Sequence, residues 1–362
     1  MNRQITFLAV LILYLLICGT AQAVVQYTVT DLGTLGGMNS EAFGINASGQ
    51  IAGSSYTTSY EHAFLYSNGH MTDLGTIGGL TSEATDINAS GQVVGQGLTQ
   101  SNTFLHAFLY SHGTMKDLGT LGGTDSFAYG INAGGKVVGC SYNSNGSHRA
   151  FLYSNSTMTD IGTLGGMESW AYDINTGGQI AGVSYTTGYS TPHAFIYNGS
   201  TMKDLGTIGG TWSEAKSIND SGQVAGYAAI SGDASHHAFL YNGSSMVDLG
   251  TIGGTWSEAY SVNISGQVVG VAGAPGDPPQ HAFFYDGSTM SDLNTLIDPQ
   301  SGWTLAGAYG INDAGQIVGE GYHNSGYLRA YLLTPVPEPS TLGLLCSALL
   351  GLSWVGLVRR RK

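Results

Sequence analysis

The chain has 362 residues and is acidic, with 24 Asp and Glu against 11 Lys and Arg and a net charge of −13. All 24 carboxylates but only six of the basic residues lie between Val24 and Ser340, which gives this region a charge of −18. Such a region is a poor partner for nucleic acid or anionic lipid. It contains one cysteine, Cys140, and therefore no intrachain disulfide.

The first 23 residues have the pattern of a removable signal peptide. A basic residue precedes an apolar run, residues 5–18, that is too short to span a bilayer comfortably. Ala21 and Ala23 are small residues at the positions that a signal peptidase reads. We therefore expect cleavage before Val24 and export of the remaining chain.

Residues 24–333 consist of seven similar units. The segment Asp-Leu-Gly, or a near variant, recurs in steps of 42 to 44 residues, and its first residues are Asp31, Asp73, Asp117, Asp160, Asp204, Asp248 and Asp292. An Ile-Asn or Val-Asn pair, a Gly-Gln-x-x-Gly segment and the run His-Ala-Phe-Leu-Tyr recur with the same period, with variations. Repeats of this length are typical of solenoids and propellers.

Each unit has four short apolar runs separated by Gly, Asn and Ser, and none has the 3.6-residue periodicity of a helix. The segment Asn-x-Ser-Gly-Gln predicts a hairpin between the first two runs, because Asn and Gly tolerate a positive φ. Four strands per unit favour an all-β fold, a seven-bladed β-propeller. An open β-solenoid array is the alternative.

The two ends of the repeat region favour a closed ring. Residues 27–35 have the pattern of a fourth strand without three strands before it, and residues 309–333 have that of three strands without a fourth. Together they complete one blade and leave no exposed sheet edge. We therefore expect the N-terminal strand to pair with residues 329–333.

Three segments follow the repeats. Residues 334–340 are rich in proline, which predicts an extended linker that a processing enzyme can reach. Residues 341–358 are apolar over about the minimum length of a transmembrane helix. Residues 359–362 are all basic, which predicts a cytoplasmic tail.

The repeats resemble a known family. The unit Ile-Asn-x-x-Gly-Gln-x-x-Gly followed by His-Ala-Phe-Leu-Tyr is similar to the HAF repeat of extracellular proteins, over residues 27–333. Arg149 and Arg329 replace the His in two units, which argues against an obligatory chemical role for that side chain.

The C-terminal segment resembles a PEP-CTERM sorting signal, in which a Pro-Glu-Pro motif precedes an apolar helix and a basic end. The motif here is Pro337, Glu338 and Pro339. This resemblance implies a Gram-negative bacterium whose exosortase-type enzyme recognises the motif and releases or transfers the protein at the cell surface, often alongside exopolysaccharide production. The protein would be anchored in the membrane only before this processing.

The recurring polar side chains do not predict metal or cofactor chemistry. Equivalent His residues in a ring lie too far apart to share one ion, so we interpret them as structural residues at the start of a strand. The recurring Asp is interpreted as a turn cap that accepts backbone N–H groups, and the Asn-x-Ser segments as turns. No nucleophile elbow, zinc-protease motif or phosphate-binding loop is found. We therefore do not expect an enzyme.

The tryptophans indicate a binding surface. A loop of the form x-x-Ser-x-Ala follows Gly-Gly in the first six units, and equivalent loops of a propeller emerge at one end of the ring. Four of the five tryptophans lie in this connection, namely Trp170, Trp212, Trp256 and Trp303. Aromatic rings beside carboxylates suit sugars. Packing between the blades is the alternative.

These patterns predict an exported cell-surface or extracellular-matrix protein, a non-catalytic binding or structural module associated with exopolysaccharide. Its expected partners are an exosortase-type enzyme and extracellular polysaccharide. The alternative is a propeller hydrolase or lyase that acts on polysaccharide, because two carboxylates from different blades suffice for such chemistry and their spacing in sequence would not reveal them.

Overall fold

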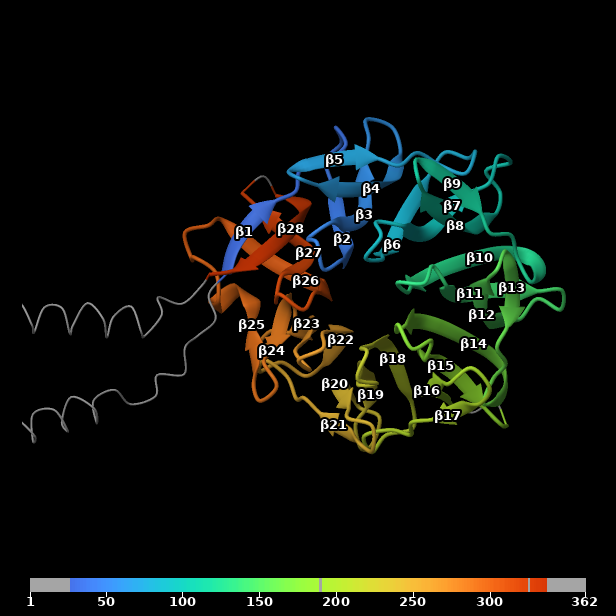
Figure 1. Ribbon diagram of the computed structural model, residues 1–362. Helices are drawn as coiled ribbons and strands as arrows, with labels where there is room; N and C mark the ends of the chain where they lie inside the picture. The colour runs from blue at the N-terminus through green and yellow to red at the C-terminus, as the bar shows by residue number, and fades with distance from the viewer. Residues whose placement is uncertain (1–26, 189–190, 325, 337–362) are drawn as a thin grey trace, which may run out of the picture. The chain divides into compact units, whose positions relative to one another are not determined.

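The computed structural model describes residues 27–188, 191–324 and 326–336. Their regular elements are 28 strands and one 3-10 turn, η1 (Leu293–Thr295). The strands form seven four-stranded antiparallel sheets around a central axis (Figure 1). The unit Thr28–Thr334 is therefore a seven-bladed β-propeller, as the sequence predicts, and the alternative of an open solenoid is wrong.

Six blades each consist of four consecutive strands, and the first strand lies nearest the axis (Figure 1). Blades 1 and 2 contain β2 (Ser40–Ile45), β3 (Ile51–Tyr56), β4 (Glu61–Ser67), β5 (His70–Asp73), β6 (Ser82–Ile87), β7 (Val93–Leu98), β8 (Leu105–Ser111) and β9 (Thr114–Asp117). Blades 3 and 4 contain β10 (Gly122–Ile131), β11 (Val137–Asn143), β12 (His148–Ser154), β13 (Thr157–Asp160), β14 (Gly165–Ile174), β15 (Ile180–Thr186), β16 (Pro192–Tyr197) and β17 (Met202–Asp204). Blades 5 and 6 contain β18 (Ser213–Ile218), β19 (Val224–Ala229), β20 (His236–Tyr241), β21 (Met246–Asp248), β22 (Ser257–Val262), β23 (Val268–Gly273), β24 (Gln280–Tyr285) and β25 (Met290–Asp292).

Blade 7 joins the two ends of the ring. It consists of β26 (Trp303–Ile311), β27 (Ile317–His323) and β28 (Tyr327–Pro335), and β1 (Tyr27–Asp31) is its outer strand. The backbone N–H of Leu32 donates to the carbonyl of Ala330 at 3.0 Å. The predicted closure is confirmed.

The closing strand is shorter than predicted, because it ends at Asp31 rather than at residue 35. The Asp31 carboxylate accepts the backbone N–H of Gly33 at 2.8 Å, and Gly33 has a φ of +78°. This cap turns the chain away from the sheet, since glycine adopts a positive φ without steric cost.

The Asn of each Ile-Asn pair connects its blade to the next. Asn46 Nδ2 donates to the carbonyl of Asn88 at 3.0 Å, and the series continues around the ring until Asn312 donates to Asn46 at 3.1 Å. The intermediate bonds measure 2.8 to 3.2 Å. Each of these seven Asn side chains is buried and also caps its own hairpin turn. The turn interpretation is confirmed, and this Asn belt adds a link that the sequence did not reveal.

The Ser of the x-x-Ser-x-Ala loop forms a second link between blades. Ser82 Oγ accepts the backbone N–H of Ala63 in blade 1 at 2.9 Å and donates to the carbonyl of Gly75. The equivalent serines are Ser40, Ser126, Ser169, Ser213 and Ser257.

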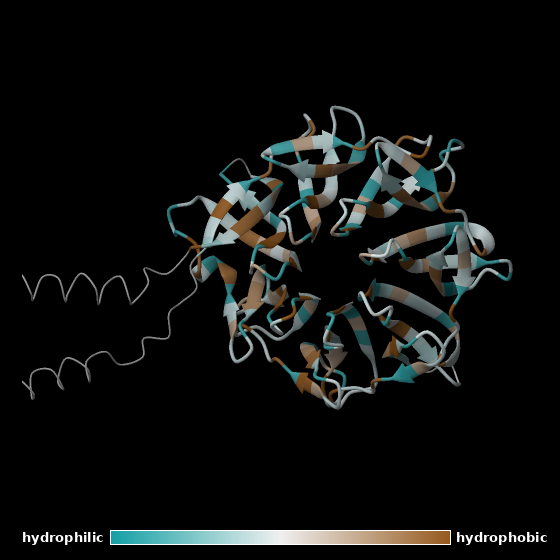
Figure 2. Ribbon diagram, viewed as in Figure 1, coloured by the Kyte–Doolittle hydropathy of each residue, from teal (hydrophilic) through white to brown (hydrophobic). Residues whose placement is uncertain are grey.

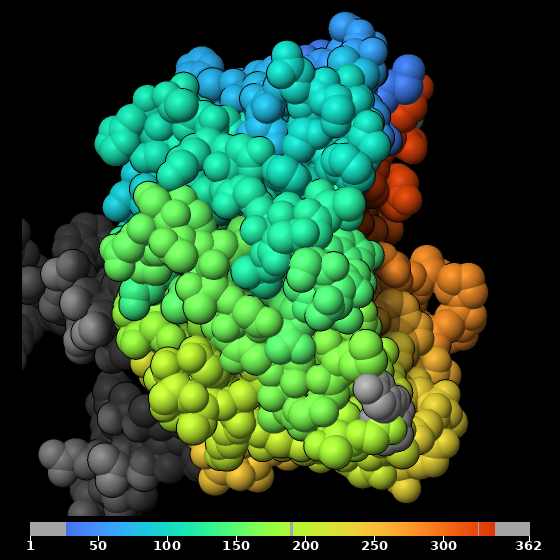
Figure 3. Space-filling view, turned by 90° about the vertical axis from the view of Figure 1, so that its right-hand side faces the viewer, coloured from blue at the N-terminus to red at the C-terminus, as the bar shows by residue number. Residues whose placement is uncertain are grey.

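The Phe of the His-Ala-Phe run is fully buried between the strands. Figure 2 shows apolar and polar residues alternating along the strands, and Figure 3 shows blades 2 to 4 packed side by side.

The His of the His-Ala-Phe run pairs with the recurring Asp of its own blade. His62 Nδ1 lies 2.9 Å from Asp73 Oδ2, and Asp73 Oδ1 accepts the backbone N–H of Gly75 at 2.7 Å. Arg149 keeps the pairing where it replaces His, at 2.9 Å from Asp160. The interpretations of both residues as structural are confirmed.

The predicted terminal segments lie outside the described residues. They are the signal peptide 1–23 with its cleavage residues Ala21, Ala23 and Val24, the sorting motif Pro337, Glu338 and Pro339, the apolar helix 341–358 and the tail 359–362. Within the described ranges, no helix has the length and hydropathy that crossing a bilayer requires.

Candidate binding site in the central channel

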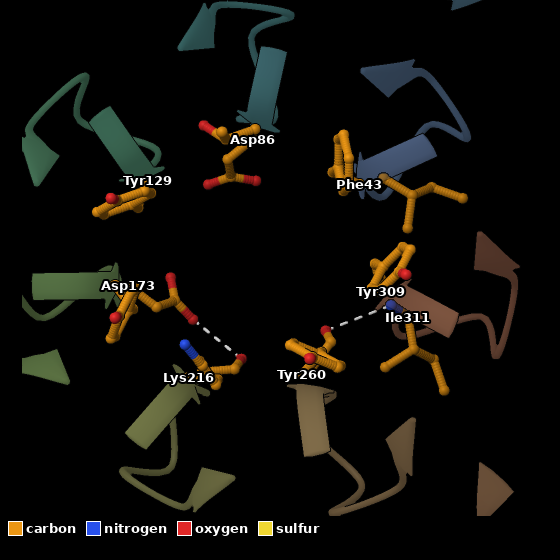
Figure 4. Close-up of a pocket in the computed structure, with 15 residues that line it drawn as sticks. Phe43, Asp86, Tyr129, Asp173, Lys216, Tyr260, Tyr309 and Ile311 are labelled. Atoms are coloured by element: carbon orange, nitrogen blue, oxygen red, sulfur yellow. Dashed lines mark hydrogen bonds between the residues drawn. The ribbon is translucent and has the colours of Figure 1, made fainter. Parts of the chain in front are cut away.

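A β-bulge interrupts every inner strand at the same position. In β2 the pairing with β3 shifts between Ala42 and Gly44, so that Phe43 has no partner, and the other six inner strands have the same irregularity. The seven bulged residues are Phe43, Thr85, Tyr129, Tyr172, Lys216, Tyr260 and Tyr309. A bulge re-aims a side chain, and here it places all seven around the central channel (Figure 4).

The channel encloses a cavity of about 130 Å³. Five of the seven bulged residues around it are aromatic, and polar groups enter at the next position, where Asp86, Asp173, Ser217 and Ser261 lie. The volume corresponds to roughly four water molecules. The cavity can therefore admit a small chemical group, whereas a complete disaccharide would have to remain at its mouth.

The residues that follow the bulge have a structural role. Asp86 Oδ2 accepts the backbone N–H of Ile131 in the next blade at 2.8 Å, and Asp173 Oδ2 accepts that of Ile218 at 2.8 Å. Burial, with a contribution from the charge of Asp173, raises the pKa of Asp86 to about 8. Burial also raises the pKa of Asp173. These two carboxyl groups bind their neighbouring blades and hold protons more strongly than ordinary Asp residues do.

A second ring of side chains lies two residues before the bulges. It contains the carboxylates Glu41, Glu83, Glu214 and Glu258, with Phe127, Trp170 and Gly307 at the equivalent positions. Gly307 pairs with Glu320 on β27, which supplies a carboxylate in blade 7. The hydroxyl groups of two bulged tyrosines reach these acids: Tyr260 donates to Glu258 at 2.5 Å and Tyr309 donates to Glu320 at 2.7 Å. The circle of bulged aromatic residues and the circle of acidic residues therefore form one connected site.

Blades 4 and 5 hold the one basic residue among the bulged positions. Lys216 Nζ pairs with Glu214 and lies 3.8 Å from the centroid of the Tyr172 ring and 5.5 Å from that of Tyr227. The Tyr227 hydroxyl donates to the same Glu214 carboxylate at 3.0 Å. We call these four residues the blade 4–5 cradle.

At the channel, blades 7 and 1 place aromatic and acidic side chains that form no ion pair with a basic side chain of the described residues. Phe43 and Tyr309 have ring centroids 5.4 Å apart, and Glu41 and Glu320 lie beside them. We call these four residues the blade 7–1 sector. Burial, followed by the charges of Glu320 and other carboxylates, raises the pKa of Glu41 to about 7. Among the described residues, no side chain donates a hydrogen bond to Glu41.

The four predicted tryptophans are half-buried: Trp212 and Trp256 lie just before β18 and β22, Trp303 is the first residue of β26, and Trp170 lies within β14. Trp212 and Trp256 flank the ring of His236, at centroid distances of 5.6 and 5.8 Å. His236 Nε2 lies 3.0 Å from Glu258 Oε1, which connects this pair of tryptophans to the acidic ring.

The other two tryptophans each have a separate histidine neighbour. Trp170 lies 5.1 Å from His148, and Trp303 stacks on His323 at 4.9 Å. The structure therefore brings two of the four tryptophans together. Ligand binding by these tryptophans stays a prediction, with packing between the blades as its alternative.

The sequence analysis did not predict that the bulged residues, or the acidic residues two positions before them, form a site. A signal for both was present, because the residue after the Ala of x-x-Ser-x-Ala is aromatic in four of the first six units, and the residue before it is Glu in four of them. Within the described ranges, no three His, Cys, Asp or Glu side chains converge in a way that could hold a metal ion.

The C-terminal end carries a recognised sorting signal. The family model described as the PEP-CTERM protein-sorting motif matches residues 335–362. This match confirms the predicted motif, which implies secretion and sorting in Gram-negative bacteria with processing by an exosortase. The resemblance of the repeats to the HAF family stays a prediction.

Similarity to solved structures supports the fold. The β-propeller domain of the Trilobed protease from Pyrococcus furiosus is 7% identical with a TM-score of 0.51, and the match covers 85% of this chain and 93% of that domain. That domain is described as having an open velcro topology, whereas β1 closes the ring here.

Two further matches have lower TM-scores. TolB from Acinetobacter baumannii is 12% identical, with a TM-score of 0.44 and coverage of 83% of this chain and 65% of that one. Dipeptidyl peptidase 4 of Porphyromonas gingivalis is 11% identical, with a TM-score of 0.44 and coverage of 79% and 51%. No curated protein sequence matches this chain.

Proposed function

We propose that this protein is a non-catalytic carbohydrate-binding propeller of the cell surface or extracellular matrix, which binds exopolysaccharide at the mouth of its central channel. The ring of five bulged aromatic side chains with carboxylates beside them carries this proposal. Aromatic faces suit the C–H faces of sugars, and carboxylates accept hydrogen bonds from sugar hydroxyls. Trp212 and Trp256 would extend this surface outward from Glu258.

The size of the cavity suggests how a polymer is bound. Ligand pockets for drug-sized molecules have volumes of roughly 300 to 1,000 Å³, whereas this cavity has about 130 Å³. A polysaccharide would therefore lie across the mouth of the channel and insert one substituent. The repeated blades would serve as a rigid frame that keeps the aromatic groups in position.

The test of this function is binding of purified exported protein to the exopolysaccharide of the producing cells. Trp212→Ala and Trp256→Ala should each weaken binding by about 3- to 10-fold, the range expected for loss of an aromatic contact. Phe104→Ala is the matched control, because Phe104 is exposed outside the channel. A fall in melting temperature with unchanged affinity would show that these tryptophans only pack.

Membrane anchoring and release are part of the same proposal. We propose that the helix 341–358 anchors the chain until an exosortase acts at Pro337, Glu338 and Pro339. Replacing these three residues with Ala should leave the protein in the membrane fraction at its unprocessed size. Release of that variant into the medium at the wild-type size would contradict the proposal.

A polysaccharide-acting hydrolase or lyase is the second candidate, because the channel contains carboxyl groups whose pKa values diverge. Burial raises the pKa of Glu320. Burial also acts to raise the pKa of Glu258, but hydrogen bonds from His236 and Tyr260 bring it below its usual value. Incubation with exopolysaccharide decides between the two candidates: new reducing ends or unsaturated products that disappear in Glu320→Gln would favour the enzyme.

A further inference from the structure

The channel already contains one ammonium group, and its surroundings show how such a group is held. Lys216 Nζ lies over the Tyr172 ring at 3.8 Å, near Tyr227, and pairs with Glu214. Aromatic faces attract cations through their quadrupole, and the carboxylate supplies the opposite charge. The blade 4–5 cradle is thus a site for an ammonium group that the chain fills itself.

The blade 7–1 sector has the same chemical parts and no basic side chain. Phe43 and Tyr309 occupy the bulge positions that Lys216 and Tyr172 occupy in the cradle. The Tyr309 hydroxyl donates to Glu320, as that of Tyr227 donates to Glu214 in the cradle. No Lys, Arg or His in the described part of the chain forms an ion pair with Glu41 or Glu320. The two sides of the channel therefore differ in charge: Lys216 supplies a cation in the blade 4–5 cradle, whereas the blade 7–1 sector contains none of its own (Figure 4).

Neighbouring carboxylates increase the attraction of this sector for a cation. After burial, the charges of Glu320, Glu61 and Glu83 are the causes that raise the pKa of Glu41. Burial raises the pKa of Glu83 and Glu320 as well. A bound positive charge would relieve the repulsion between these groups and favour their ionised forms.

An organic ammonium group fits this sector better than a metal ion does. Among the described residues, no group of three His, Cys, Asp or Glu side chains is placed so that it could hold a metal ion. Calcium requires six to eight oxygen ligands, whereas an ammonium group is held by aromatic faces and one or two carboxylates. The walls formed by Phe43 and Tyr309 supply such faces.

We propose that the blade 7–1 sector binds the ammonium group of an amino sugar, in the role that Lys216 plays in the blade 4–5 cradle. The inference rests on the proposed carbohydrate function and names its ligand class, glycans with free amino groups. Phe43 and Tyr309 of the sector line the cavity, which has room for an amino substituent while the rest of the sugar lies at the mouth. Uronic acids and sulfated sugars are disfavoured, because their charges would face Glu41, Glu83 and Glu320.

The decisive experiment compares two oligosaccharides that differ only at their amino groups, which are free and cationic in one and acetylated and neutral in the other. The full-length exported protein is titrated at pH 7 by calorimetry with a glucosamine oligosaccharide and with its N-acetylated counterpart. We expect the amino form to bind at least tenfold more tightly. Titrations in buffers with different ionisation enthalpies should also reveal proton release, because a bound cation favours ionised Glu41.

Variants assign the preference to the sector. Glu41→Gln and Glu320→Gln should each reduce affinity for the amino oligosaccharide at least tenfold and leave affinity for the acetylated one unchanged. Glu168→Gln is the matched control, because Glu168 of blade 4 pairs with His148 of blade 3, outside the sector. Melting temperatures verify folding of each variant. Two independent variants keep the assignment testable if one of them fails to fold.

Each outcome has a distinct meaning. Equal affinity for the two oligosaccharides would overturn the ammonium site and leave the carbohydrate function standing. Failure of the protein to bind either oligosaccharide or the exopolysaccharide would overturn both. Putrescine and calcium chloride are the remaining probes, and binding of either one more tightly than the amino oligosaccharide would overturn the assignment to amino sugars.

Discussion

The two sides of the channel use similar residues for opposite purposes. In the blade 4–5 cradle, Lys216 neutralises Glu214 and covers an aromatic face, so that the charges are satisfied within the chain. In the blade 7–1 sector, Glu41 has no donor among the described residues and its pKa rises to about 7. A repeated frame can therefore fix the geometry of a site, while single substitutions decide whether that site is filled by a side chain or open.

The largest effect is expected from opening the ring at the blade 7–1 sector. Deleting residues 24–35 removes β1 and exposes the edge of β28, whereas blades 4 and 5 keep all their strands. The truncated protein should lose several kcal/mol of stability, since a whole strand and its buried contacts are absent. Thermal unfolding measures this loss, and a melting temperature equal to that of the intact protein would contradict the closure.

Removal of the cation from the cradle is expected to have the next largest effect. Lys216→Met leaves Glu214 without its positive partner, which should cost about 2 kcal/mol, less than for a fully buried pair because both side chains are partly exposed. Lys203→Met is the matched control, because Lys203 lies on the outer strand β17 and its ammonium group donates to the Tyr241 hydroxyl rather than to a carboxylate. Equal losses of stability in urea would show that the cradle has no special role.

Replacing Glu with Gln should change the stability of the protein in opposite directions in the blade 7–1 sector and in the blade 4–5 cradle. Glu41→Gln should stabilise the protein by about 1 kcal/mol at pH 8, because it removes a buried, repelled charge. Glu214→Gln should destabilise it, because Lys216 loses its carboxylate. The gain from Glu41→Gln should vanish near pH 4, below the ordinary Glu pKa of 4.5, since Glu41 is then protonated in the folded and in the unfolded state. Chemical denaturation at both pH values provides the measurement.

The smallest effect concerns the pH dependence of the whole domain. A carboxyl group whose pKa is raised in the folded state contributes stability below its unfolded pKa and loses that contribution as pH rises through the folded pKa. With pKa values of about 8 for Asp86 and about 7 for Glu41, stability should fall between pH 5 and pH 8. Asp86→Asn should flatten this slope in thermal scans, and an unchanged slope would assign it to other groups.

The sequence predicted the frame of the molecule because the frame is repeated. The recurring Ser, Asn and His occupy the same positions in unit after unit, and their common spacing indicated seven blades and the shared last one. The links that these side chains form between blades were not predictable, because the partner of Asn46 lies 42 residues away and is a carbonyl group.

The site was harder to predict because it consists of the residues that vary. Phe43, Lys216 and Tyr309 occupy equivalent positions with different side chains, so that no motif unites them. Only a bulge common to all inner strands brings them to one channel. The tryptophans were prominent in the sequence because they are rare, and rarity identified a region near the site rather than its centre.

The Asn belt has a direction and no end. Each side chain gives its donor to the following blade and each carbonyl receives one from the preceding blade, and the step from Asn312 to Asn46 is the same as the other six. The belt is therefore the same between blades 7 and 1, where the two ends of the ring meet, as between any other two blades. A gene rearranged to start at another blade would therefore encode the same closed circuit of hydrogen bonds.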